Sequence, residues 1–325
     1  MSTTSPTKIS IVGAAGTVGS SIAFSLILNP IAGQIILSDP QTEILQAQAE
    51  DLRDAILQSD TTSTRVHVAE DPKEAGQADI IIITAGAAQK KGESRTDLVG
   101  KNAKILKSVA EGLGNVKKEA VVICVANPVD VMTFFAQTFI KGLPKEQIFG
   151  SGTLLDSARL KGQLAQQIGI SQSNIEAFVL GEHGESQVVA WSAVSVGGVP
   201  LDRIEKNGNG NVNINREEIS EKTKDKAGAI IEGKGTTNYG IGAVVGSICK
   251  AVLFDQRVIR PVSHWNEGLG VCLSMPAVIG RGGLVRSVEL PGLSGEEMGR
   301  IRKSAESLRE VVGEAEKVLE EGEGK

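Results

Sequence analysis

The sequence predicts an α/β fold in which a doubly wound parallel sheet is followed by a second domain of mixed α+β structure. Short apolar runs rich in Val and Ile alternate with longer helix-like segments through the first half of the chain. These runs lack the in–out alternation of a half-exposed strand, which indicates strands buried on both faces. A glycine-rich turn also joins the first run to a helix-like segment, as a nucleotide-binding sheet requires.

The predicted elements of the first half follow one another as strand and helix. Helix-like segments at residues 17–29, 41–59 and 96–113 carry apolar residues at helical spacing. Strands separated by such helices pair in parallel. The strand-like runs are "KISIV", "QIILSD", "RVHVAE", "DIIIIT" and "EAVVICVANP", the last of which ends at Pro128.

The second half of the chain has a different pattern, with glycine-rich and polar stretches between its elements. We therefore divide the chain into two domains, residues 1–150 and residues 151–325. The elements predicted for the second domain are a helix at 153–169, a strand and turn at 175–186, a polar loop at 205–218, a closely packed helix at 235–252, an antiparallel strand pair at 271–280 and 283–290, and an amphipathic helix from Ser294.

Composition excludes several classes of function. At 325 residues the chain is long enough for two domains. A net charge of −5 leaves no excess of cations for nucleic acid. No apolar run approaches the roughly 18 residues of a membrane span, and the N-terminus has no apolar leader. The three cysteines are scattered in apolar settings without metal-ligand spacing, so we expect reduced thiols, no metal and a cytoplasmic protein.

The glycine-rich turn is a candidate nucleotide site. Gly13, Gly16 and Gly19 are spaced as GxxGxxG and not as GxGxxG. Glycines here let the backbone approach a pyrophosphate at a helix N-terminus. Asp39 ends the second strand twenty residues after Gly19, where a carboxylate can bind the adenosine ribose and repel a 2′-phosphate, which favours NAD over NADP. Two alternatives remain open from these residues: an S-adenosylmethionine site, and an empty turn with Asp39 as a turn residue before Pro40.

Four residues are suited to chemistry. Asp156 and Arg159 lie three apart in a predicted helix and so share a face, and His183 lies between glycines after an apolar strand. Histidine can take a hydroxyl proton as hydride leaves the same carbon, and aspartate can stabilise the imidazolium. Arg159 can grip a carboxylate, while Arg95, beyond "DIIIIT", can polarise a carbonyl from a closing loop. The simpler interpretation of Asp156 and Arg159 is a surface ion pair, and that of His183 is a structural histidine.

These stretches resemble a known family. "GSGTLLDSAR", "GEHGESQVVAWS", "TAGAAQKKGESR" and "VANPVD" are similar to signature stretches of the NAD-dependent lactate/malate dehydrogenases, in that family's order and spacing. "MPAVIGRGGLVRSVELPGLSGEE" resembles the family's closing strand pair, and the similarity extends from about Lys8 to the C-terminal helix. The resemblance implies a Rossmann-type first domain, a second domain for substrate and catalysis, and hydride transfer between NAD and a small 2-hydroxy acid.

The resemblance also implies a role for each site residue. His183 would donate and accept the proton, with Asp156 as its partner, while Arg95 polarises the carbonyl. Arg159 would bind the substrate carboxylate, and Asn127 would bond near the carbonyl. The simpler roles are a turn residue for Asn127, a helix cap for Ser151 and core packing for Ile241. The implied cofactor-binding residues are Gly13, Gly16, Gly19, Asp39, Gly86, Asn127, Ser151 and Ile241.

Two positions favour the lactate type over the malate type. In the family that this chain resembles, malate-type members carry an arginine six residues before the loop arginine, and here that position holds Gln89, six before Arg95. A neutral amide cannot pair with a second substrate carboxylate, and an unpaired charge in a closed site is costly. Thr237 matches the threonine of lactate-type members. Against this, "GAAGTVG" resembles the malate-type turn, but that turn contacts the cofactor and not the substrate side chain.

Activation by fructose 1,6-bisphosphate is not expected. By the resemblance, bacterial lactate-type members that respond to this sugar bisphosphate carry an arginine two residues after the carboxylate-binding arginine. They also carry a histidine seven residues before the catalytic one. Lys161 and Glu176 occupy these positions here. A carboxylate repels a phosphate.

The resemblance suggests a homodimer or homotetramer, and we expect a cytoplasmic protein that serves glycolysis or fermentation. Its partner would be a small 2-oxo or 2-hydroxy acid, with no nucleic acid and no membrane. Two alternatives are weighed: a malate dehydrogenase of the same family, and a catalytically silent nucleotide-binding scaffold. A scaffold is expected to lose part of the catalytic set, whereas His183, Asp156, Arg95 and Arg159 are all present.

Overall fold

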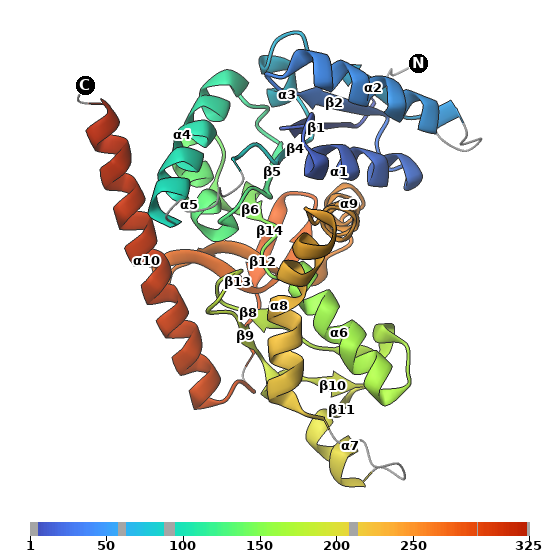
Figure 1. Ribbon diagram of the computed structural model, residues 1–325, viewed down its shortest axis with the longest axis vertical. Coiled ribbons are helices and arrows are strands. Elements are labelled where there is room, and N and C mark those ends of the chain that lie inside the picture. Colours follow the sequence, from blue (N-terminus) through green and yellow to red (C-terminus); the bar gives the residue numbers. More distant parts are fainter. Residues whose placement is uncertain (1–5, 58–62, 88–94, 208–213, 291, 324–325) are drawn as a thin grey trace.

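A nine-stranded sheet forms the centre of the computed structural model, which describes residues 6–57, 63–87, 95–207, 214–290 and 292–323 (Figure 1). Within these ranges its strand order is β14-β13-β12-β6-β5-β4-β1-β2-β3. The strands are β1 (Lys8–Val12), β2 (Gln34–Ser38), β3 (Arg65–Val68), β4 (Ile80–Ile83), β5 (Val121–Cys124), β6 (Ile148–Gly150), β12 (Val258–Asn266), β13 (Val271–Gly280) and β14 (Gly283–Ser287).

Strands β1 to β6 all run parallel. β2 and β3 lie on one side of β1, while β4, β5 and β6 lie on the other. The carboxyl ends of β1 and β4 therefore form the topological switch point, where open α/β sheets bind their ligands. This order confirms the predicted doubly wound parallel sheet.

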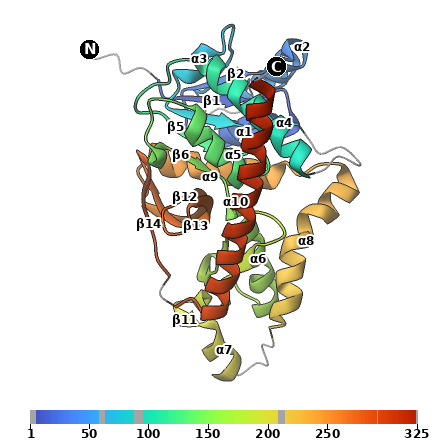
Figure 2. The same cartoon turned by 90° about the vertical axis from the view of Figure 1, so that its left-hand side faces the viewer.

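Helices cover both faces of this sheet. α10 runs along one side of the molecule beside α4 and α5 (Figures 1 and 2). The helices are α1 (Thr17–Leu28), α2 (Thr42–Leu57), α3 (Lys73–Gly76), α4 (Arg95–Leu113), α5 (Val129–Phe139), α6 (Leu154–Ile168), α7 (Leu201–Asn207), α8 (Arg216–Lys234), α9 (Tyr239–Leu253) and α10 (Gly295–Glu323), with 3-10 turns η1 (Lys145–Gln147), η2 (Gln172–Asn174) and η3 (Trp191–Ala193).

The strand β4, all isoleucine, shows why the apolar runs do not alternate. Ile80 and Ile82 belong to a core formed with α1, α2 and α9. Ile81 and Ile83 belong to a second core formed with α4, α5 and α10. Because each face of the strand meets a helical layer, every position must be apolar.

A smaller part of the chain surrounds a third core, built on α6, α7 and α8. α6 ends at Gly169 in the left-handed conformation, φ 77°, which favours glycine at this position. The strands are β7 (Ile175–Glu176), β10 (Ser195–Val196) and β11 (Val199–Pro200) in one sheet, and β8 (Val179–Leu180) with β9 (Val188–Val189) in another. The "GEHGES" turn lies between two short paired strands, of which β8 precedes it and β9 follows it.

The structure corrects some of the predicted elements. The antiparallel pair β13–β14 is confirmed, but the unpredicted strand β12 joins it to the parallel sheet, pairing with β6 at Ser263 and Gly150. The predicted polar loop 205–218 is wrong at both ends, because α7 extends to Asn207 and α8 begins at Arg216. Helices α3, α5, α7 and α8 were not predicted, and residues 58–59 and 208–213 lie outside the described residues. None of the described helices is long and apolar enough to cross a membrane.

Candidate active site

Three of the predicted site residues, the catalytic Asp156 and His183 and the substrate-binding Arg159, meet at the buried carboxylate of Asp156. Its Oδ1 accepts a hydrogen bond from Arg159 Nη1 at 3.2 Å, and its Oδ2 lies 2.6 Å from His183 Nδ1. The Asp156 and Arg159 side chains are only 3% and 8% exposed, whereas that of His183 is 28% exposed. The alternative of a surface ion pair is therefore wrong, and the imidazole is the accessible member of the group.

The local fold explains this meeting. Asp156 lies in the first turn of α6, three residues before Arg159, so both project from one face. His183 follows β8 through Gly181, which has φ 83°. A Cβ at Gly181 would lie 3.0 Å from Ser304 Oγ, so the turn needs glycine both for its conformation and for its packing.

The electrostatics of the group favour an ionised pair. Burial raises the pKa of Asp156, but the charge and hydrogen bond of His183, followed by those of Arg159, outweigh burial and hold that pKa below its ordinary value. Burial alone would lower the pKa of His183, yet the Asp156 carboxylate raises it above its ordinary value. Since a carboxylate only accepts, Nδ1 is the donor, and Nε2 is left to exchange a proton with a ligand.

The residues predicted to bind the nucleotide lie at the carboxyl ends of β1 and β2. Gly13 has φ 90°, and a Cβ there would lie 2.6 Å from Ala85 N. No side chain caps α1 at Gly16 in the described structure, and a Cβ at Gly19 would lie 2.5 Å from Gly13 O. Asp39 accepts from Ala15 N at 3.2 Å, which ties this carboxylate to the glycine turn. It also accepts from Gln41 N at 2.9 Å, the bond of an ordinary turn residue.

Asn102, on α4, is a site residue that sequence reasoning missed. Its Oδ1 accepts from Ala87 N at 2.7 Å, and its Nδ2 donates to the carbonyl of Asn127 at 2.8 Å. It thereby joins the segments that follow β4 and β5, among which Gly86 and Asn127 lie. An asparagine in the apolar face of a predicted helix is the only sequence signal for this role.

The remaining predicted residues lie on several different elements. Ser151 directly follows β6, is buried, and donates its main-chain N–H to the carbonyl of Cys124 at 2.8 Å. Thr237 lies half-buried between α8 and α9, and Ile241, in the first turn of α9, packs against the first core. Arg95 begins α4, but its side chain and the whole of Gln89 lie outside the described residues.

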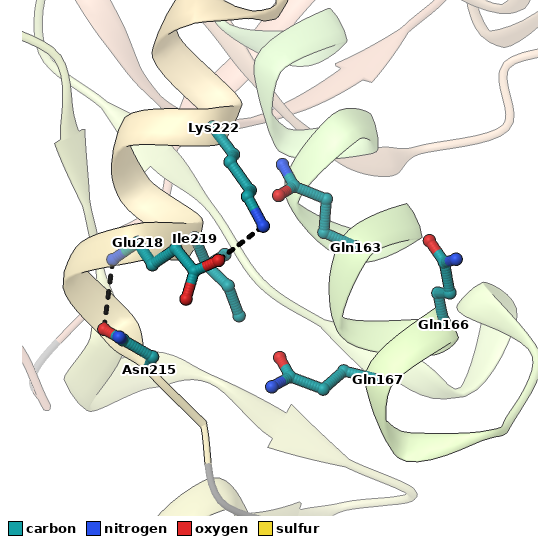
Figure 3. A pocket seen from close by; sticks show the side chains of 7 residues that line it. All are labelled: Gln163, Gln166, Gln167, Asn215, Glu218, Ile219 and Lys222. Atoms are coloured by element: carbon teal, nitrogen blue, oxygen red, sulfur yellow. Dashed lines mark hydrogen bonds and ion pairs between the residues drawn. The ribbon is translucent and has the colours of Figure 1, made fainter.

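The cavities in the described part of the chain include two of similar volume. One, of about 360 Å³, lies between α6 and α8, where glutamines of α6 face Glu218 and Lys222 of α8 (Figure 3). It contains none of the predicted site residues. The other, of about 380 Å³, is lined partly by Lys161 and Arg260. No group of three or more His, Cys, Asp or Glu side chains within the described ranges could hold a metal ion.

Comparison with known proteins assigns the family. The NAD-binding domain of lactate/malate dehydrogenases matches residues 7–150, and the α/β C-terminal domain of the same family matches residues 153–319. The chain is 42% identical to L-lactate dehydrogenase A of Rhizopus oryzae, over 96% of this chain and 94% of that protein. It is 38% identical to an L-lactate dehydrogenase of Bifidobacterium animalis subsp. lactis, over 95% and 97% respectively.

Solved structures agree with this assignment. A lactate dehydrogenase from a Medee basin deep-sea metagenome has a TM-score of 0.90 at 31% identity, over 95% of this chain and 99% of that one. The ligand-bound minor L-lactate dehydrogenase of Enterococcus mundtii has a TM-score of 0.88 at 29% identity, over 94% and 98%. The predicted family and the predicted NAD cofactor are therefore confirmed. The chain belongs to the lactate/malate dehydrogenase family of NAD-dependent oxidoreductases.

Proposed function

We propose that this protein is an L-lactate dehydrogenase, which reversibly reduces pyruvate to L-lactate with NADH. The observation that carries the proposal is the buried Asp156 carboxylate, which contacts both His183 and Arg159. This arrangement places a proton carrier beside a carboxylate-binding group, as reduction of a 2-oxo acid requires. The curated relatives of this chain that are named L-lactate dehydrogenases support the same assignment.

The residues of the first domain fit a dinucleotide. The N-terminus of α1 lies beside the glycine turn without a side-chain cap, so its N–H groups can receive a pyrophosphate. Asp39 lies next to that turn and can bind the ribose hydroxyls. We assign Gly13, Gly16 and Gly19 to the pyrophosphate. Gly86, Asn127, Ser151 and Ile241 are assigned to the nicotinamide half.

The reaction adds a hydride to the carbonyl carbon and a proton to the carbonyl oxygen. When bound, NADH would supply the hydride. His183 gives the proton from Nε2, and Asp156 stabilises the imidazolium before transfer. Arg159 has one hydrogen bond to Asp156, which leaves other guanidinium donors for the substrate carboxylate. Arg95 is assigned to polarise the carbonyl.

The preference for pyruvate rests on Gln89 and Thr237. An amide at position 89 has no charge to offer the second carboxylate of oxaloacetate, whereas the methyl group of pyruvate needs none. Thr237 narrows the pocket toward pyruvate size.

The wild-type enzyme is therefore expected to oxidise NADH with a higher kcat/KM on pyruvate than on oxaloacetate. Steady-state loss of NADH absorbance with each 2-oxo acid measures this preference, and chiral analysis of the product tests for L-lactate. A preference for oxaloacetate would make the protein a malate dehydrogenase. No NADH oxidation with any member of a panel of 2-oxo acids would favour the silent scaffold.

Fructose 1,6-bisphosphate is expected to leave the pyruvate saturation curve unchanged. Lys161 Nζ lies 3.2 Å from Glu176 Oε2, so the cation already has an anionic neighbour, which would repel an incoming phosphate. The curve is measured with and without the sugar bisphosphate at several pH values. A clear shift of the curve to lower pyruvate concentration would contradict this prediction.

We further propose a homodimer or homotetramer, in the cytoplasm, with a role in glycolysis or fermentation. Exposed apolar side chains on neighbouring helices support subunit contacts, among them Phe24 and Leu28 on α1 and Tyr239 on α9. The three cysteines are all buried and unpaired, which supports a reducing compartment. We keep residues 1–150 as the nucleotide domain and residues 151–325 as the substrate domain.

A further inference from the structure

Asp130 is a buried carboxyl group that the mechanism above does not use. It lies in the first turn of α5, between Val129 and Val131, and is 1% exposed. Val131, the next residue along the helix, belongs to the core that α5 shares with α4 and α10. A carboxyl group in such surroundings is costly unless it makes specific hydrogen bonds. The partners of Asp130 should therefore explain its presence.

The partner of Asp130 is the catalytic residue itself. Its Oδ2 accepts the main-chain N–H of His183 at 2.7 Å, while the ring of the same histidine is bonded to Asp156 at 2.6 Å. The two carboxyl groups come from different helices, α5 and α6. Asp130 accepts from the main chain of the histidine and Asp156 contacts its ring. The two helices together therefore fix the position of His183.

The second oxygen of Asp130 faces the sheet. Asp130 Oδ1 and Ser263 Oγ, on β12, are both buried without a hydrogen-bond partner among the described residues. Burial raises the pKa of Asp130 to about 6, although the facing Ser263 hydroxyl and the His183 N–H lower it. His183, Glu182 and Cys272 are the other titratable groups that act on this carboxyl or are acted on by it. Burial holds the Cys272 thiol neutral, because its pKa lies well above its ordinary value.

We propose that Asp130 is a positioning residue for proton transfer: it fixes the main chain of the His183 turn and places a second negative charge near the imidazole. The inference rests on the proposed function of His183. A displacement of about 1 Å at a reacting group costs up to about 100-fold in rate, so the backbone anchor bears directly on turnover. The charge of Asp130 also favours the imidazolium, together with Asp156 and against Arg159.

Two substitutions of Asp130 separate the effect of its hydrogen bond to the His183 main chain from the effect of its charge. Asp130→Ala removes both the acceptor and the charge, and we expect kcat for pyruvate reduction to fall about 10- to 100-fold. KM for pyruvate is expected to change less than about threefold, because Arg159 is untouched. Asp130→Asn keeps an acceptor for the His183 N–H, and its amide can donate to Ser263 Oγ. We expect it to restore kcat at low pH to within about threefold of the wild type.

Asp79 offers a matched control. Its Oδ2 accepts the main-chain N–H of Lys8 at 2.7 Å, the same contact at the same length, before β4 and away from His183. Asp79→Ala should lower thermal stability without lowering kcat. Circular dichroism and NADH fluorescence confirm folding of each variant. The proposal is overturned if Asp130→Ala keeps kcat within about twofold of the wild type. It is also overturned if Asp79→Ala lowers kcat as much as Asp130→Ala does.

A titration by NMR tests the charge independently of turnover. The chain has only three histidines, His67, His183 and His264, so their ring signals can be assigned by single substitution. The pKa of His183 is expected to fall in Asp130→Asn and to stay unchanged in Asp79→Asn. An unchanged His183 pKa in Asp130→Asn would overturn the electrostatic part of the proposal. A wild type that never reduces pyruvate would instead overturn the proposed function, whatever the NMR titration shows.

Discussion

Replacing His183 with asparagine is expected to lower kcat for pyruvate reduction by about 10³-fold, within the range that a single acid–base group contributes. Asparagine can still donate a hydrogen bond to Asp156, so the buried carboxylate keeps a partner, but no proton can be delivered to the carbonyl oxygen. KM for pyruvate should change little, because Arg159 remains. Steady-state kinetics with NADH measure both constants.

The protonation state of His183 should make the rates of pyruvate reduction and lactate oxidation depend on pH in opposite directions. Pyruvate reduction needs the imidazolium, and Asp156 raises the pKa of His183 above its ordinary value. The rate should therefore be maximal below that pKa and fall as the pH rises through it, whereas lactate oxidation should show the opposite trend. The matched control is His67→Asn, because His67 pairs with Glu74 in a partly exposed position away from the site. A His183→Asn enzyme with wild-type kcat would remove His183 from the mechanism.

Replacing Gln89 with arginine is expected to shift the ratio of kcat/KM for oxaloacetate over pyruvate by about 10²- to 10³-fold toward oxaloacetate. Leaving a charge unpaired in a closed site costs about 3–5 kcal/mol, and arginine would supply the missing partner. The same cation gives pyruvate nothing to bind, so its kcat/KM should fall. Both substrates are assayed with wild type and variant under identical conditions.

Lys91→Gln is the control for this second prediction. It alters a charge two residues from Gln89, and the substrate ratio should stay within about twofold of the wild type. If Gln89→Arg leaves the ratio unchanged, position 89 does not contact the substrate, and the lactate preference would rest on Thr237 and the relatives alone.

The sequence predicted the parallel sheet well because its strands are continuous apolar runs, as in β4. It missed α8 because this helix is polar around most of its surface, so no apolar stripe marks it. It missed β12 because Pro261 argues against a strand. The strand tolerates that proline since it pairs with β6 only at Ser263, away from the missing N–H. α5 was not predicted because it is rich in β-branched and aromatic residues, which are weak helix formers.

By itself, the sequence determined the fold class, the family and the residue types at the site, because strand pattern, glycine spacing and the three-residue offset of Asp156 and Arg159 are local properties. Only the tertiary structure decided how deeply that pair is buried and which groups hold His183. Asp156 and Asp130 lie 27 and 53 positions from His183 along the chain. Contacts across such separations depend on how α5 and α6 pack against the turn after β8, and no local pattern encodes that packing.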